Sequence, residues 1–168
     1  MSSKMYAKKV VLVALYVLLA FWIVFIFYNS SLCADDSNAS SGVFVRFFVE
    51  KIMRLDFEGV NENTIAFVTK VIRKLAHFTE YAILASLSFL ILFLHGKKLW
   101  LCAIAPTSFC ALVAVLDEYS QRFASGRSPQ MSDVLIDTAG GLFASLILIV
   151  LILIISKFNK NVRKNERI

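Results

Sequence analysis

Side chains that can transfer protons or hold an anion occur at the ends of three strongly apolar stretches of this chain. His77 and Glu80 are three residues apart, and Asp133 and Asp137 are four apart, so each pair shares one face of a helix. An imidazole beside carboxylates suits acid–base chemistry, and a guanidinium group suits the binding of carboxylate or phosphate. The candidate binding residues are Arg73, Lys74, His77, Glu80, Tyr81, Asp117, Glu118, Gln121, Arg127, Asp133 and Asp137. The catalytic candidates among them are His77, Glu80, Asp117 and Asp137.

Four apolar stretches must position these residues, and they lie at 10–28, 75–94, 99–116 and 134–155. Each is close to the length of about 20 residues that a helix needs to cross a bilayer. The composition agrees, because 58% of the 168 residues are hydrophobic and only 18% are charged. We therefore predict an all-α fold in which residues 1–168 form a single membrane domain. It is a four-transmembrane-helix bundle with a long outer loop at 29–74.

Basic residues flank these stretches and account for the net charge of +6 without a nucleic-acid partner. Lysines occur within 4–9, 97–98 and 157–164, and segments rich in Lys and Arg stay on the cytoplasmic side of a membrane. This rule places both termini in the cytoplasm. The polar residues at the ends of the apolar stretches then all lie at the outer end of the bundle, at a similar depth.

The outer loop is predicted to contain an amphipathic helix over Val43–Leu55. Its apolar and its charged side chains recur at helical spacing on different faces, the apolar ones being Phe44, Phe47, Phe48, Ile52 and Leu55 and the charged ones Arg46, Glu50 and Arg54. Such a helix lies in the membrane interface or covers the bundle as a lid, and both alternatives remain open. A further helix is expected to begin near Asn63 or Thr64 and to continue to Leu94.

Charged groups at membrane depth are costly and seldom face lipid, so the polar helix faces should turn inward. We therefore expect one site at the outer end, formed by His77, Glu80, Asp117, Arg127 and Asp137. Glu118 and Arg122 should point elsewhere on their helix.

Simpler roles fit several of these residues when each is taken alone. Asp133 suits a helix N-cap, Tyr81 suits the aromatic belt at the membrane interface, and Arg73 with Lys74 suits an interface anchor. Independently of the site, Gly140-Gly141 forms small-x-x-x-small pairs with later residues of the fourth stretch, which predicts close approach of another helix there.

A joint motif extends over most of the chain. Its runs are FYNSS at 27–31, KLAHFTEYAIL at 74–84, DEYSQRF at 117–123, Gly126-Arg127, and DVLIDTAG at 133–140. Together they resemble the VanZ-like family, with a departure at Asp137, where many members carry Asn. The resemblance implies a four-span protein of the bacterial cytoplasmic membrane. It also implies a link to low-level resistance against teicoplanin-type lipoglycopeptides, without a change in the D-Ala end of peptidoglycan precursors.

Two classes of function fit the expected site, and the first is binding. The protein would bind or shield an anionic lipid or a lipid-linked cell-wall intermediate at the outer leaflet, and would thereby contribute to lipoglycopeptide resistance. The phosphate would be held by Arg73, Lys74 and Arg127. The carboxylates that orient these bases would be Glu80, Asp117, Glu118 and Asp137.

The second class is a membrane-interface enzyme acting on a lipid phosphate or a glycolipid. His77 would be the general base or nucleophile, oriented by Glu80 or Asp137. The sequence requires no cofactor, although a divalent metal could assist if it were bound by Asp117, Glu118 and Asp137. No established hydrolase or phosphate-loop motif supports catalysis. A channel fits least, because the inner half of the bundle lacks polar residues, and no pattern indicates the oligomeric state.

Overall fold

The computed structural model describes residues 3–31, 42–123 and 130–165, and these are mostly helical, with no strand among them. The long helices are α1 (Ser3–Ser31), α3 (Glu62–Leu94), α4 (Leu99–Ser120) and α5 (Met131–Asn165). All four are long and apolar enough to cross a membrane. The predicted all-α fold with four membrane-spanning helices is thus confirmed.

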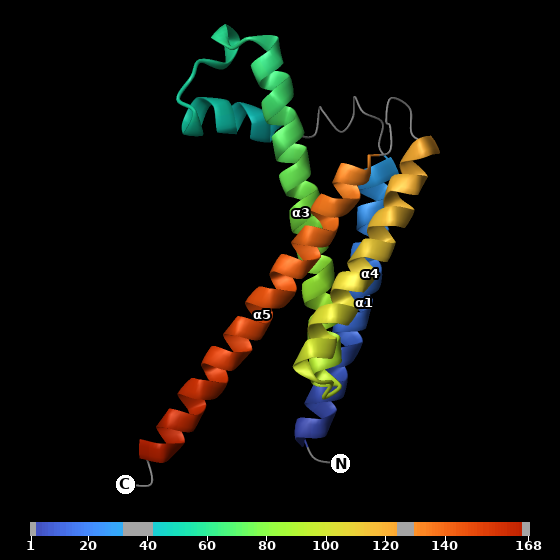
Figure 1. The fold of residues 1–168 in the computed structure, drawn as a ribbon, viewed down its shortest axis with the longest axis vertical. Coiled ribbons are helices and arrows are strands. Elements are labelled where there is room, and N and C mark those ends of the chain that lie inside the picture. The colour runs from blue at the N-terminus through green and yellow to red at the C-terminus, as the bar shows by residue number, and fades with distance from the viewer. Residues whose placement is uncertain (1–2, 32–41, 124–129, 166–168) are drawn as a thin grey trace.

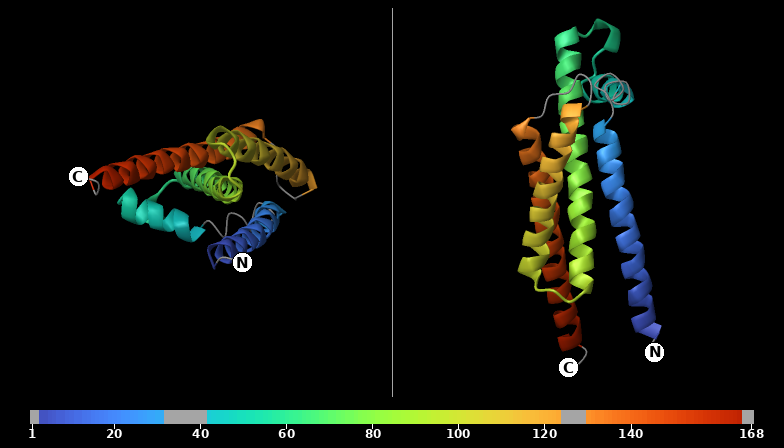
Figure 2. Two further views of the ribbon diagram at one scale, coloured as in Figure 1. Left: turned by 90° about the horizontal axis from the view of Figure 1, so that it is seen from below. Right: turned by 90° about the vertical axis from the view of Figure 1, so that its right-hand side faces the viewer.

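Helix α3 is central to the bundle and packs against α1, α4 and α5. In Figure 1, α1 and α4 run alongside α3, whereas α5 crosses α3 at an incline and leans away toward its C-terminal end. Figure 2 shows the same bundle from below and from the side. Both termini and the turn between α3 and α4 lie at one end, and the beginning of α3 extends beyond the other end (Figure 1).

The helices extend past the apolar stretches from which they were predicted. Helix α3 does run from the outer loop through the membrane segment, as expected, but its N-cap is Asn61 rather than Asn63 or Thr64. The Asn61 side chain accepts a hydrogen bond from the backbone N–H of Asn63 at 2.9 Å. This bond satisfies one of the backbone donors that the first turn of a helix leaves without an intrahelical acceptor.

The predicted amphipathic helix corresponds to helical residues 42–52, which end in a π-helical turn, η1 (Phe48–Ile52), and are followed by the short 3₁₀ turn η2 (Phe57–Gly59). Its buried side chains are Val45 and Val49, which pack against Val68 of α3. Of the predicted aromatic face, Phe44 and Phe47 are exposed, at 66% and 58% accessible, whereas Phe48 is partly buried against this cluster. Whether the segment lies in the membrane interface or covers the bundle as a lid stays a prediction.

Helix α5 approaches its neighbours closely at Gly140 and Gly141. A Cβ atom at Gly140 would overlap the backbone carbonyl of Phe78 in α3, and one at Gly141 would lie 2.9 Å from Cys110 Sγ in α4. The prediction of close approach at these glycines is confirmed. The core beside them consists of Ile26, Tyr81, Leu84, Ala85, Cys110, Val113, Ala114 and Ala144.

Candidate functional site

The polar residues near the C-terminal end of α4 and the N-terminal end of α5 are buried, as the cost of lipid-exposed charge predicts. Asp117 is 0% and Asp137 is 1% exposed. Asp117 lies in the last turn of α4, and Asp137 lies in the second turn of α5. The Asp137 carboxyl is within electrostatic reach of Asp117, Glu118 and Glu80, which indicates that the three helices gather their acidic groups in one region.

His77 of α3 meets two of these carboxylates. One nitrogen of His77 and one oxygen each of Asp117 and Asp137 all lie within 4.8 Å of one another. Helical spacing had placed each residue on an inward face, and the packing of α3 against α4 and α5 brings the three faces together. What the three side chains bind stays a prediction.

Glu80 is held by α1, an interaction that sequence reasoning missed. Asn29 Nδ2 donates a hydrogen bond of 2.8 Å to Glu80 Oε1, and Trp22 Nε1 donates one of 2.8 Å to the Glu80 backbone carbonyl. The other carboxylate oxygen, Oε2, lies 3.7 Å from His77 Nδ1. The signal that could have revealed Asn29 is its position, because it is a polar residue at the outer end of an apolar stretch.

Glu118, which was expected to point elsewhere on its helix, lines a small pocket together with Tyr119 and Arg122. It is 6% exposed and accepts hydrogen bonds from the backbone N–H of Gln130 at 2.8 Å and from Gln121 Nε2 at 3.1 Å. Glu118 thereby ties the end of α4 to the residue before α5. Arg122 does face outward, with its guanidinium 5.2 Å from the ring centre of Tyr119.

Lys74 and Asp133 form an ion pair between α3 and α5. The Asp133 carboxylate also accepts from Ser132 Oγ at 3.0 Å. Helix α5 begins two residues earlier, at Met131, so Asp133 lies inside the first turn and is not the N-cap. The interface-anchor role suggested for Lys74 alone is likewise incomplete, because Lys74 connects two helices.

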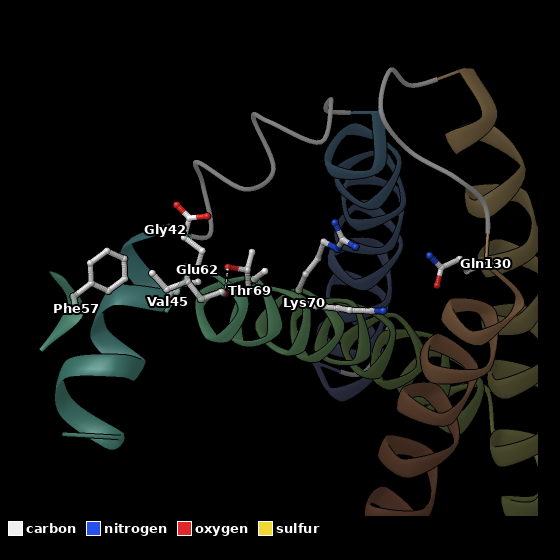
Figure 3. A pocket seen from close by; sticks show the side chains of 10 residues that line it. Gly42, Val45, Phe57, Glu62, Thr69, Lys70 and Gln130 are labelled. Atoms are coloured by element: carbon white, nitrogen blue, oxygen red, sulfur yellow. Dashed lines mark hydrogen bonds between the residues drawn. The ribbon is translucent and has the colours of Figure 1, made fainter. Parts of the chain in front are cut away.

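Arg73 lines a separate cavity beside the N-terminal part of α3. This cavity has a volume of about 540 Å³, and we call it the cationic pocket. Its charged lining residues are Lys70, Arg73 and Glu62, and its apolar walls include Val45, Phe57 and Ile65. In Figure 3, Val45 and Phe57 lie at one end of the pocket and Gln130 at the other, with Lys70 between them.

A comparison with family models gave one match, to the model described as VanZ/LLP1, over residues 13–154. That stretch covers most of the chain. The chain belongs to the VanZ/LLP1 family. Comparisons with curated proteins and with solved structures gave no match. This VanZ/LLP1 protein is therefore a multi-pass membrane protein by family and by its four candidate spans.

The matched VanZ/LLP1 region contains every candidate binding residue, but the structure distributes them over separate places. His77, Glu80, Tyr81, Asp117 and Asp137 gather inside the bundle, and we call them the polar cluster. Lys74 and Asp133 pair with each other, Gln121 donates to Glu118, and Arg73 lines the cationic pocket. Arg127 lies outside the described residues.

Tyr81 is not an interfacial aromatic, because it is 0% exposed and belongs to the core of the VanZ/LLP1 bundle. Its phenol is within electrostatic reach of Asp117 and Asp137. Among the described residues, neither the Tyr81 hydroxyl nor Oδ1 of Asp137 has a hydrogen-bond partner. The cluster thus combines one imidazole, several carboxyls and a buried hydroxyl.

Proposed function

We propose that this VanZ/LLP1 protein is a cell-envelope protein that binds the anionic head group of a lipid or lipid-linked cell-wall intermediate in the cationic pocket. The observation that carries the proposal is the combination of Lys70 and Arg73 with apolar walls in one cavity. A phosphate group accepts charge-assisted hydrogen bonds from such cations. Val45 and Phe57 provide an apolar surface for the part of the ligand next to the phosphate.

The position of the pocket along α3 supports a lipid ligand. Lys70 and Arg73 lie in the same continuous helix as the membrane segment, near its outer end. A lipid that packed its chains along this helix would bring its head group to the level of these two residues. A water-soluble ligand would not need its binding residues to lie on the same helix as a membrane segment.

The proposed membrane is the bacterial cytoplasmic membrane, with both termini in the cytoplasm and the pocket at the outer leaflet. The termini and the His95–Lys98 turn lie at the end of the bundle opposite the beginning of α3 (Figure 1), and residues from that beginning line the pocket. This arrangement agrees with the distribution of basic residues, which favours the cytoplasmic side for all three segments.

The proposed phosphate-binding residues differ in part from those that the sequence suggested. Lys74 is engaged by Asp133, whereas Lys70, which was not among the candidates, lines the pocket together with Arg73. We therefore assign the phosphate to Lys70 and Arg73. A contribution of Arg127 stays a prediction.

Catalysis on a lipid phosphate is a second candidate function, and the polar cluster is the observation that favours it. Asp117 and Asp137 are at most 1% exposed, however, so a substrate would reach them only after the helices separated. We prefer binding for this reason. Lipid analysis of membranes that contain His77→Asn separates the two functions, because an enzyme would accumulate its substrate and a binding protein would not.

Native mass spectrometry of the purified protein in detergent tests the binding proposal. Phosphatidylglycerol should remain bound at collision energies that remove phosphatidylcholine. Lys70→Gln together with Arg73→Gln should abolish this preference, because a hydrogen bond to a charged group contributes about 1.5–3 kcal/mol, or roughly tenfold to a hundredfold in affinity.

The matched control is Lys97→Gln with Lys98→Gln, which removes the same charge from the opposite end of the bundle. It should leave the preference intact. Equal retention of phosphatidylglycerol by the two double variants would refute the assignment of the pocket. In cells, the proposed shielding predicts that expression in a susceptible host raises the teicoplanin concentration needed for inhibition, and that Lys70→Gln/Arg73→Gln removes the increase.

A further inference from the structure

The polar cluster places buried anionic groups where neither water nor lipid can stabilise their charge. Asp137 is 1% exposed and lies within electrostatic reach of several other carboxyl groups. A buried carboxylate is tolerated when it is paired, protonated or bound to a metal. Lys74 of α3 is engaged by Asp133, which lies one helical turn before Asp137.

The donor atoms of three residues are close enough to share one ion. His77, Asp117 and Asp137 each supply an atom within 4.8 Å of the other two. Ligand atoms around an ion with bonds of about 2.0–2.2 Å are about 3–4.4 Å apart. Small side-chain rotations that shorten the distances between the three atoms by about an ångström would bring them to the spacing of ligands around one ion.

Two further atoms indicate that this space receives a ligand. Oδ1 of Asp137 and the hydroxyl of Tyr81 are both buried, and neither finds a hydrogen-bond partner among residues 3–31, 42–123 and 130–165. Buried polar atoms are nearly always satisfied, so two such atoms in one cluster require a cause. Coordination would satisfy the Asp137 oxygen, and a water molecule carried by the ion would accept from Tyr81.

The surroundings of His77 also resemble those of a metal ligand. Glu80 Oε2 lies 3.7 Å from His77 Nδ1, and the hydrogen bond from Asn29 fixes the Glu80 carboxylate. Histidines that bind metals usually have their second ring nitrogen next to a carboxylate or carbonyl group, which orients the ring. Glu80 and Asn29 are therefore positioning residues for His77.

From this geometry we infer that His77, Asp117 and Asp137 bind one divalent transition-metal ion, with Tyr81 beside it. Mixed imidazole and carboxylate donors suit Mn²⁺ or Zn²⁺ better than Ca²⁺, which takes oxygen ligands alone. The ligand set differs from the all-carboxylate set that the sequence suggested, because Glu118 is occupied by Gln121 and Gln130. The ion would hold α3, α4 and α5 together at their outer ends.

Metal analysis of the purified protein tests this inference without reference to lipid binding. The protein, free of any histidine tag, is stripped with a chelator, incubated separately with Mn²⁺ and Zn²⁺, and passed through a desalting column. One of the two metals should be retained at about one ion per chain. It should also raise the thermal midpoint by roughly 5 °C when present at about 100 times its dissociation constant.

Asp137→Asn and Glu118→Gln are the matched variants, since each removes one buried carboxylate charge at nearly constant volume. Asp137→Asn should lose the ion and the thermal shift, whereas Glu118→Gln should keep both. Retention of neither metal by the unmodified protein would overturn the inference. Equal metal loss in both variants would overturn it as well.

Arg127 is an alternative source of positive charge for the polar cluster, because it follows the C-terminal end of α4 in the sequence. Arg127→Gln should leave the metal content unchanged if the ion neutralises the cluster. If Arg127→Gln lowers the thermal midpoint of chelator-treated protein while added metal has no effect on either protein, Arg127 and not a metal supplies the charge.

Discussion

Replacing Gly140 by Ala should disturb the contact on which the polar cluster depends. The added Cβ atom would overlap the carbonyl oxygen of Phe78, and it would lie 3.0 Å from the carbonyl carbon and 3.2 Å from Cα of the same residue. Nonbonded carbon atoms prefer about 3.5–4.0 Å, so α3 and α5 must separate by about half an ångström or more. The obstacle is backbone, which cannot rotate away as a side chain would.

The energetic cost follows from two opposing effects. Overpacking in a close-packed interior costs about 1–3 kcal/mol, whereas Ala is favoured over Gly within a helix by about 1 kcal/mol. We expect a net loss of about 1–2 kcal/mol, seen as a lower thermal midpoint in detergent. His77 directly precedes Phe78, and Asp137 lies three residues before Gly140. The same displacement should therefore weaken the binding of any ligand that His77 and Asp137 share.

Gly59→Ala is the matched control, because a Cβ atom there meets no other atom within 4 Å. It should leave the midpoint unchanged or raise it slightly. The thermal midpoint is measured by fluorescence for both variants in the same detergent. If Gly140→Ala is as stable as Gly59→Ala, the helices do not approach as closely as the structure indicates, and the reasoning fails.

Three further predictions concern the site and the topology. Asn29→Ala should lower the thermal midpoint by an amount equivalent to about 1.5–3 kcal/mol, since Glu80 loses a charge-assisted hydrogen bond of 2.8 Å; an unchanged midpoint would show that α1 does not hold Glu80. Asp137→Ala should reduce the yield of folded protein on size-exclusion chromatography, because breaking a buried charged network costs about 3–5 kcal/mol, whereas Asp137→Asn should retain it; equal yields would contradict a buried network. In a cysteine-free background, Glu58→Cys should react with an impermeant maleimide in whole cells and Lys98→Cys should not, and the reverse result would invert the topology.

The apolar and charged patterns of the sequence were enough to predict the helices and the direction of their polar faces. Apolar runs of about 20 residues specify membrane helices irrespective of their partners, because a helix satisfies its own backbone hydrogen bonds. The inward placement of Asp117 and Asp137 followed from the cost of exposing charge to lipid. The glycines of α5 similarly predicted close approach, since small residues allow it in any bundle.

The partner of each polar side chain was decided only by the tertiary structure. Arg73 and Lys74 are adjacent in sequence, yet one lines the cationic pocket and the other pairs with Asp133. Glu118 was expected only to point elsewhere on its helix, and the structure joins it to Gln130 by a hydrogen bond. Periodicity gives the face of a helix on which a residue lies, but the rotation of that helix about its axis and its crossing angle with a neighbour determine what the face meets.

The largest gap between sequence and structure is the role of α1. Its apolar stretch gave a membrane helix but no reason to connect Asn29 or Trp22 with Glu80, which lies more than fifty residues later. A single polar residue carries no periodic signal, so its partner is defined only when two helices pack. The sequence by itself therefore determined the elements and their buried faces, whereas the packing of α3 against three neighbours determined which side chains share a site.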